Sequence, residues 1–203
     1  HNGRAKVIGT DLATLAKTAS SRKLDWEAIT TFFAFGFFLD DRTYYQDIRI
    51  LLPGSLYRFS GEGELLEHRK YLNWNHQVNY SRSYSETIDE YHTLLQQAVR
   101  RCSADVNVLL PISGGLDSRS IAAVMPSGGE VSSYSYGYTS DSIETHIASQ
   151  IAKARDFTFT SHVISPYLFE RLAEIIEVLH GSQDVTQARQ ASISDWLKSH
   201  GDA

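Results

Sequence analysis

The chain has 203 residues, of which 42% are hydrophobic, so it can bury a substantial core as one large or two small domains. Its net charge of −5 and the lack of a dense Lys/Arg run argue against a surface for nucleic acid or for an anionic membrane. A single cysteine, Cys102, excludes an internal disulfide framework and fits a reducing compartment such as the cytoplasm.

Short elements of mixed type are predicted for the first 75 residues. Asp25 is a favourable N-cap for a helix over residues 26–35, which Gly36 would end. The apolar run 32–39 is much shorter than the roughly 20 residues that cross a bilayer, so we expect it in a core. Pro53-Gly54 lies between two apolar segments and predicts a hairpin turn. The expected elements are a strand at 6–9, helices at 12–16 and 26–35, strands at 48–52 and 56–59, and a second turn at 60–64.

A regular alternation of elements is predicted for the second half of the chain. The stretch 71–84 is rich in Asn, Ser and Tyr without periodicity, which indicates a linker with a domain boundary near residue 76. The expected elements that follow are helices from 86, at 116–125, 142–154 and 166–180, and strands at 106–112, 131–138 and 157–164. This alternation predicts an α/β fold with a doubly wound parallel sheet.

The junction between the strand 106–112 and the helix after it has the sequence Ser113-Gly114-Gly115-Leu116-Asp117-Ser118. Two adjacent glycines let the backbone approach an anion closely, and the first amides of the helix point at that anion. The motif lacks the Gly-Lys-Ser/Thr ending of the other common phosphate loop, which argues against kinase or GTPase chemistry. We therefore predict a pyrophosphate site, with an ordinary strand-to-helix turn as the alternative.

Asp117 implies a metal ion at this site. A bare carboxylate would repel phosphates unless a hard cation lay between them, so the motif predicts Mg²⁺ at Asp117. The alternative is a first-turn acid that the helix dipole favours. A cradle for the β and γ phosphates leaves the α phosphorus of ATP open to attack, which gives AMP transfer with pyrophosphate as the leaving group. ATP and Mg²⁺ are thus the expected substrate and cofactor, and the acceptor is a carboxylate.

The motif 113–118 resembles the SGGxDS pyrophosphate loop, or PP-loop, of the N-type ATP pyrophosphatases. The chain around it resembles the asparagine synthetase family within that group. Segment 24–59, which contains Leu52-Pro53-Gly54, is similar to the stretch that joins the glutamine amidotransferase domain to the synthetase domain in this family. The resemblance covers most of residues 20–165 and implies an adenine nucleotide alpha-hydrolase-like fold for the synthetase domain.

The resemblance implies a fragment of two domains and an amide-forming reaction. Residues 1–75 would be the C-terminal remnant of an α+β glutamine amidotransferase domain plus linker, and residues 76–203 a truncated ATP pyrophosphatase synthetase domain. The implied enzyme is an ATP-dependent carbon–nitrogen ligase of the glutamine-hydrolysing asparagine synthase type, in asparagine biosynthesis, and the fragment alone would be inactive. It would adenylate an aspartate-like side-chain carboxylate, and ammonia derived from glutamine would displace AMP. The alternatives are a β-lactam- or peptide-ring-closing relative that uses the same adenylation, and a non-catalytic nucleotide-binding module.

The resemblance also assigns roles within the loop. Ser113 and Ser118 would donate hydroxyl hydrogen bonds to the pyrophosphate, Gly114 and Gly115 would line the nest, and Asp117 would hold Mg²⁺. Expected partners are small molecules, namely ATP, an amino-acid carboxylate, and ammonia or glutamine, with neither nucleic acid nor a membrane. The oligomeric state stays open, with a homodimer among the alternatives.

Four further residues have roles that depend on the resemblance. Ligands lie at the carboxyl ends of the strands in such a sheet, and by motif position Ile112 and Tyr136 would frame the adenine. A plain core or rim role is the alternative for both. Arg119 stands where many family members carry Ser or Thr, and would either bind a phosphate or carboxylate or lie on the helix surface. In the family, the glutaminase reaction uses an N-terminal cysteine. Cys102 is expected to be a structural thiol, so residues 1–203 are not expected to carry that reaction.

Overall fold

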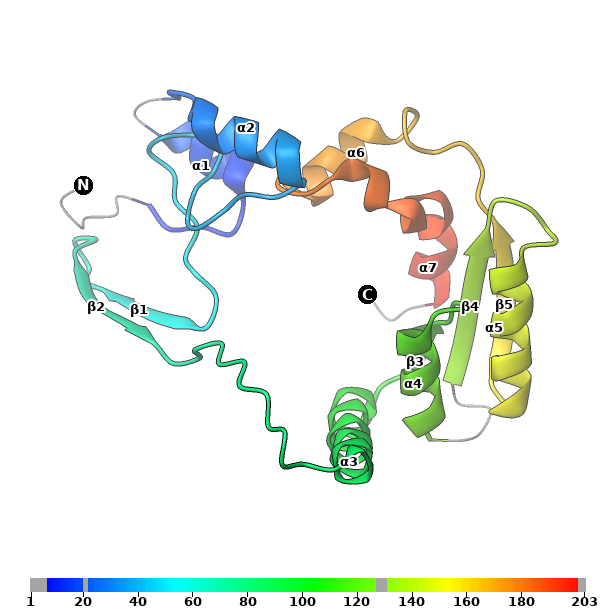
Figure 1. Cartoon of the computed structure of the whole chain (residues 1–203). Helices are drawn as coiled ribbons and strands as arrows, with labels where there is room; N and C mark the ends of the chain where they lie inside the picture. The colour runs from blue at the N-terminus through cyan, green and yellow to red at the C-terminus, as the bar shows by residue number, and fades with distance from the viewer. Residues whose placement is uncertain (1–6, 20–21, 127–130, 201–203) are drawn as a thin grey trace. The chain divides into compact units, whose positions relative to one another are not determined.

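A computed structural model describes residues 7–19, 22–126 and 131–200, which form two compact units (Figure 1). The first unit comprises the described residues up to 77 together with 171–188, and the second comprises those of 78–170 together with 189–200. The first contains α1 (Leu12–Thr18), α2 (Trp26–Phe35), β1 (Ser55–Phe59), β2 (Leu65–Lys70), α6 (Leu172–Val178) and the 3-10 helix η1 (Val185–Gln187). The second contains α3 (Tyr84–Ser103), β3 (Val108–Pro111), α4 (Leu116–Val124), β4 (Val131–Gly137), α5 (Ile143–Ala154), β5 (Thr158–Val163), the 3-10 helix η2 (Arg189–Ile193) and α7 (Ser194–His200).

Side-chain caps begin the helices α1 and α2 of the first unit. The Asp25 carboxylate accepts a hydrogen bond from the Ala28 amide at 3.1 Å, and Gly36 ends α2 with φ 78°, a left-handed conformation that suits glycine. The expected helices α1 and α2 are therefore confirmed. The strand expected at 6–9 is wrong for residues 7–9, which form no regular element, and Lys6 lies outside the described residues.

The hairpin of the first unit lies one turn later than expected. Strands β1 and β2 pair antiparallel across residues 60–64, so the hairpin expected at Pro53-Gly54 is wrong. The Gly54 carbonyl instead accepts hydrogen bonds from the amides of Tyr71 and Leu72, at 2.8 and 3.1 Å. The Pro-Gly turn therefore ties the start of β1 to the chain that leaves β2.

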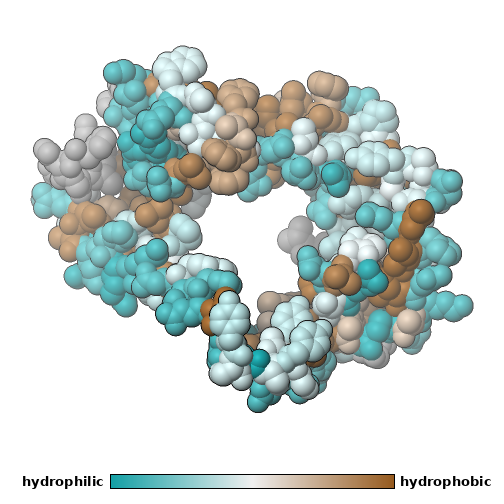
Figure 2. Space-filling model, in the orientation of Figure 1, coloured by the Kyte–Doolittle hydropathy of each residue, from teal (hydrophilic) through white to brown (hydrophobic). Residues whose placement is uncertain are grey.

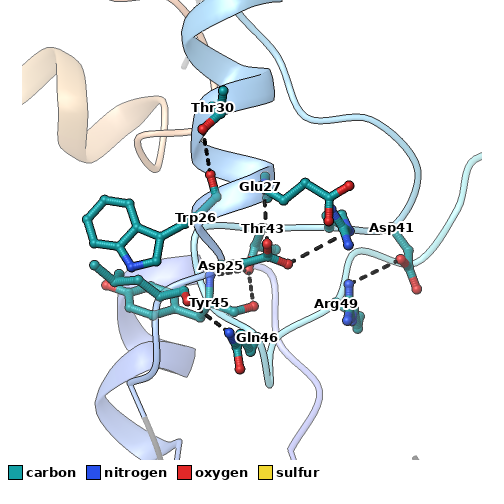
Figure 3. A network of polar contacts seen from close by, with 12 residues as sticks. Asp25, Trp26, Glu27, Thr30, Asp41, Thr43, Tyr45, Gln46 and Arg49 are labelled. Carbon is teal, nitrogen blue, oxygen red and sulfur yellow. Dashed lines mark hydrogen bonds and ion pairs between the residues drawn. The ribbon is translucent and has the colours of Figure 1, made fainter.

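Residues 48–52 form a loop rather than the expected strand, because loop contacts take their backbone groups. Thr43 is only 2% exposed, and its hydroxyl lies 2.9 Å from the Ile48 carbonyl as a donor. The Ile50 amide donates to the Asp41 carbonyl at 2.8 Å. Figure 3 shows Thr43 and Asp41 within this polar network beside the start of α2. A strand at this position would have to break both bonds.

The phenylalanines near α2 divide between a half-buried cluster and the surface. The rings of Phe32, Phe38 and Tyr44 lie with centroids 4.6 to 5.4 Å apart. Phe33, Phe35, Phe37 and Leu39 are exposed, Phe33 by 84%, so the core position expected for the run 32–39 is wrong over most of its length. Figure 2 shows apolar residues gathered over α2 and α6. Among the described residues, no helix combines the length and the apolar character that a membrane span requires.

The second unit is built on a parallel sheet of three strands in the order β3-β4-β5. The helix α4 follows β3 and α5 follows β4, so the expected alternation of strands and helices is confirmed. A capping box, in which the Ser83 hydroxyl and the Glu86 carboxylate bond each other's backbone amides, begins α3 at Tyr84. Within the described residues the strand order does not reverse, so the doubly wound arrangement stays a prediction.

Different helices cover the two faces of this sheet. The core lies between one face and helices α3, α4 and α5, and consists of Val99, Leu110, Ile112, Ala122, Val124, Met125, Val131, Ala148, Ala152 and Phe157. On the other face, the Tyr134 ring meets Trp196 of α7 at 5.4 Å, and its hydroxyl accepts a hydrogen bond from Gln190 at 3.0 Å. The expected helix at 166–180 is confirmed only over α6, and η2 and α7 were not expected.

Candidate functional site

The expected phosphate loop leaves the sheet at the carboxyl end of β3 and enters α4. The Ile112 amide donates to the Tyr134 carbonyl at 2.8 Å, which continues the pairing of β3 with β4 by one residue. Gly115 is the N-cap of α4, with φ −74° and ψ 158°, and contributes no side chain to the cap. Residues 113–118 therefore lie at the edge where parallel sheets bind their ligands.

The two serines of the motif lie together and hold the loop closed. The Ser113 amide donates to Ser118 Oγ at 3.0 Å, the Gly115 amide donates to Ser113 Oγ at 3.1 Å, and the two hydroxyl oxygens are 3.1 Å apart. A hydroxyl carries one hydrogen and can rotate it. Each serine can therefore turn its hydrogen to an anion while it keeps the amide bond that it accepts.

Several backbone amides at the start of α4 have no protein acceptor. Within the ranges that the structure describes, no hydrogen bond is made by the N–H groups of Gly114, Leu116, Asp117 and Ser118. Amides at the first turn of a helix carry the positive end of its dipole, and they are satisfied by water, a cap or an anion. Leu116 and Asp117 are both exposed, so an anion can reach this end of the helix.

One carboxylate belongs to the loop, and a second borders it. Asp117 is an exposed acid in the first turn of α4. A Cβ built at Gly114 would lie 3.6 Å from Cγ of Glu144 on α5. In the described part of the chain, no three His, Cys, Asp or Glu side chains gather as a metal-binding group. Mg²⁺ commonly uses only one or two carboxylates together with substrate phosphates, so this donor set fits a magnesium–pyrophosphate ligand.

Arg119 does not simply lie along the surface of α4, as one interpretation of the sequence had it. Its guanidinium turns back toward the loop, where Nη2 donates to the Gly114 carbonyl at 2.7 Å and Nε donates to the Gly115 carbonyl at 3.2 Å. The helix dipole disfavours a cation so near a helix N-terminus. That mismatch is the sequence signal from which a specific partner for Arg119 could have been inferred.

The structure does not bring the side chains of Ile112 and Tyr136 together. Ile112 is 2% exposed and packs in the core beside α4 and α5. Tyr136 alternates with Tyr134 along β4, so the two tyrosines share the opposite face of the sheet. Only the backbone of Ile112 can meet a ring that stacks on Tyr136, and adenine binding by this pair stays a prediction.

Four aromatic side chains pack on the face of the sheet that η2 and α7 cover. The His162 ring lies 4.4 Å from Trp196 and 6.5 Å from Tyr134, and Trp196 stacks on His200 at 4.5 Å. His162 Nε2 is buried without a hydrogen-bond partner among the described residues. Burial, and then the nearby His200, lower the pKa of His162, while burial raises the pKa of Tyr134. Tyr134, His162 and the pair Trp196 and His200 are far apart along the chain, so no local sequence pattern predicts this cluster.

The lowered pKa of His162 predicts that the second unit loses stability in mild acid. The unfolded chain takes up a proton near the ordinary histidine pKa of about 6.5, whereas the folded unit resists it. The contribution of neutral His162 to the stability of the fold is therefore fully present above the unfolded pKa. It is lost as the pH falls through that value toward the lowered pKa of the folded protein. We expect the urea midpoint to fall between pH 7.5 and pH 5.5, and to fall less in His162→Phe. An equal fall in both proteins would contradict this account.

The β4–α5 junction beside the loop is tightly packed. A Cβ built at Gly137 would lie 2.5 Å from Cβ of Ser142 and 3.2 Å from Oγ1 of Thr145. An open depression of about 370 Å³ borders this junction, and its lining consists of Ser140, Asp141, Ser142, Thr145, His146, Ser149, Phe159 and Ser161. None of these residues belongs to the loop 113–118.

Comparison with known families supports the interpretation of this loop. A family model described as asparagine synthase matches residues 90–200. The matched range includes the loop and the whole parallel sheet of the second unit. The search of curated proteins gave no match to the chain. Residues 1–75, which the sequence analysis assigned to an amidotransferase remnant, lie outside the matched range, so that assignment stays a prediction.

Proposed function

The chain belongs to the asparagine synthase family, and from this premise we propose that it catalyses ATP-dependent, AMP-forming amide synthesis. An aspartate-like side-chain carboxylate attacks the α phosphorus of ATP and releases pyrophosphate. Ammonia derived from glutamine then displaces AMP from the acyl-adenylate and gives the amide. The observation that carries the proposal is the set of polar groups at the start of α4, namely backbone amides without acceptors, two rotatable hydroxyls and one carboxylate.

Each residue of the loop has a role in this proposal. The amides of Gly114, Leu116 and Asp117 bind the β and γ phosphates, and the hydroxyls of Ser113 and Ser118 turn their hydrogens toward them. The Asp117 carboxylate holds Mg²⁺, which supplies charge neutralisation for the leaving pyrophosphate. The protein contributes position and charge rather than a covalent nucleophile.

The adenine subsite that we propose uses one face of the sheet edge. Tyr136 is half-buried near the carboxyl end of β4, where an aromatic ring can stack on it. Ile112 contributes backbone atoms, because its side chain is already packed in the core. In this arrangement the phosphates of ATP bind to the loop, which begins at Ser113, one residue after Ile112.

Oxygen transfer tests the proposed reaction directly in the full-length protein. With L-aspartate labelled with ¹⁸O in its side-chain carboxylate, ATP, Mg²⁺ and ammonia, we expect AMP that carries one ¹⁸O, together with asparagine. The label transfers because the carboxylate oxygen that attacks the α phosphorus leaves with AMP. Mass spectrometry of AMP is the readout, and labelled pyrophosphate should exchange into ATP only when aspartate is present.

Other outcomes separate the alternatives. Formation of ADP and phosphate in place of AMP would overturn the adenylation. AMP formed from another carboxylate without any need for ammonia would favour a ring-closing relative, and ATP binding without exchange would leave a nucleotide-binding module. Cys102 is an exposed residue of α3, so Cys102→Ala is the control and should leave the rate with ammonia unchanged.

A further inference from the structure

The Arg119 guanidinium is fastened to the phosphate loop by two hydrogen bonds from one of its edges. Nη2 donates to the Gly114 carbonyl at 2.7 Å, and Nε donates to the Gly115 carbonyl at 3.2 Å. Side chains on a helix lean toward its N-terminus, which is why a residue in α4 can reach carbonyls four and five positions back. Two parallel N–H donors fixed in one plane match two successive carbonyls, a geometry that lysine cannot reproduce.

Each of these bonds also fixes an amide. In a trans peptide the carbonyl and the N–H of the next residue point in opposite directions. A Gly114 carbonyl held by Arg119 therefore sends the Gly115 amide the other way, where it donates to Ser113 Oγ at 3.1 Å. In the same way, a Gly115 carbonyl held by Arg119 points the Leu116 amide in the opposite direction, and this amide has no acceptor among the described residues.

The loop needs such a restraint because its own residues supply little. Adjacent glycines are the most flexible pair that a chain can contain, and they have no side chains with which to fix their peptide planes. The other contacts to the Gly115 carbonyl come from the single hydrogen of the Ser118 hydroxyl, at 3.3 Å, which also has the Ser113 carbonyl within reach at 3.2 Å. Without Arg119, either glycine peptide could flip and present a carbonyl oxygen to a phosphate.

We infer that Arg119 is a positioning residue, which clamps the Gly114 and Gly115 peptide planes so that the loop presents amides to the phosphates of ATP. The inference rests on the proposed function, since it presupposes a phosphate ligand at this loop. The partners of Arg119 are backbone carbonyls inside the loop. Arg119 therefore affects phosphate binding indirectly, through the backbone that it holds in place.

The test measures binding of Mg²⁺–ATP and of adenosine to the full-length protein and to Arg119→Met and Arg119→Lys. Because a hydrogen bond from a charged group contributes about 1.5–3 kcal/mol, we expect the dissociation constant for ATP to rise roughly 10- to 100-fold in Arg119→Met. Arg119→Lys should fall between, since it keeps the charge but reaches one carbonyl. Adenosine has no phosphates, so its affinity should stay the same in all three proteins.

Hydrogen exchange provides a second readout. A matched control variant tests whether the loss of one positive charge is enough to weaken ATP binding. The amides of Gly115 and Leu116 should exchange faster in Arg119→Met. Arg101→Met removes the same charge from an exposed position of α3 and should leave ATP binding unchanged. Equal ATP affinity in wild type and Arg119→Met, or a parallel loss of adenosine binding, would overturn the inference alone. A wild-type protein that binds no Mg²⁺–ATP would instead overturn the proposed function.

Discussion

Replacing Asp117 by asparagine is expected to abolish the magnesium dependence of ATP binding. Asp117 is the acid that the loop itself contributes, exposed at the first turn of α4 beside amides that have no acceptor. Two unit charges about 4 Å apart near a protein surface interact by about 4 kcal/mol, so loss of the carboxylate should weaken Mg²⁺–ATP binding by more than about 100-fold. Calorimetric titration of wild type and Asp117→Asn with ATP, in Mg²⁺ and in EDTA, measures the effect.

The sign of the effect in EDTA separates the two interpretations of Asp117. Without Mg²⁺ a bare carboxylate repels the triphosphate, so Asp117→Asn should bind ATP at least as tightly as wild type under that condition. If Asp117 only complements the helix dipole, the variant would instead keep its response to Mg²⁺. Asp195→Asn is the control, because it removes a first-turn acid from α7 in the same unit and should change neither titration.

The elements of the second unit could be predicted because each has a local signal. An apolar run bounded by turn residues marks each strand, and the expected bounds of β4 and β5 differ from the observed ones by at most one residue at each end. The strand expected at 48–52 had the same kind of signal. It failed because the Thr43 hydroxyl and the Asp41 carbonyl take backbone groups of that segment. Such contacts between separate turns leave no periodic pattern in the amino-acid sequence.

The motif residues of the candidate site could be predicted because they are contiguous, whereas the partners of the loop could not. Ile112 and Tyr136 each lie near a strand end, but whether their side chains share a face depends on the register between β3 and β4. Leu110 pairs with Ser133, so Ile112 matches Ser135 and not Tyr136. The register is a property of the folded sheet. The α7 helix was missed because its 7 residues, Ser194–His200, are too few to show a helical period.

Gly137→Ala should be among the most destabilising single substitutions in the second unit. The added Cβ would lie 2.5 Å from Cβ and 2.8 Å from Oγ of Ser142, the N-cap of α5. Gly137 also accepts the Ile164 amide at 2.8 Å through its carbonyl, so the strand cannot move away without loss of that bond. Overpacking of this kind costs about 1–3 kcal/mol, which denaturant unfolding followed by tryptophan fluorescence and by exchange of the α5 amides can measure.

A second substitution tests whether the clash with Ser142 is the cause. Ser142 makes no side-chain cap bond, and glycine at an N-cap costs only a few tenths of a kcal/mol, so Ser142→Gly alone should be nearly neutral. Combined with Gly137→Ala it removes the atoms that the new methyl group meets, and most of the lost stability should return. Gly61→Ala controls for the methyl group itself, because a Cβ there meets no atom within 4 Å. Equal stability of Gly137→Ala and wild type, or a double variant no more stable than Gly137→Ala, would show that the β4–α5 junction is not packed as described.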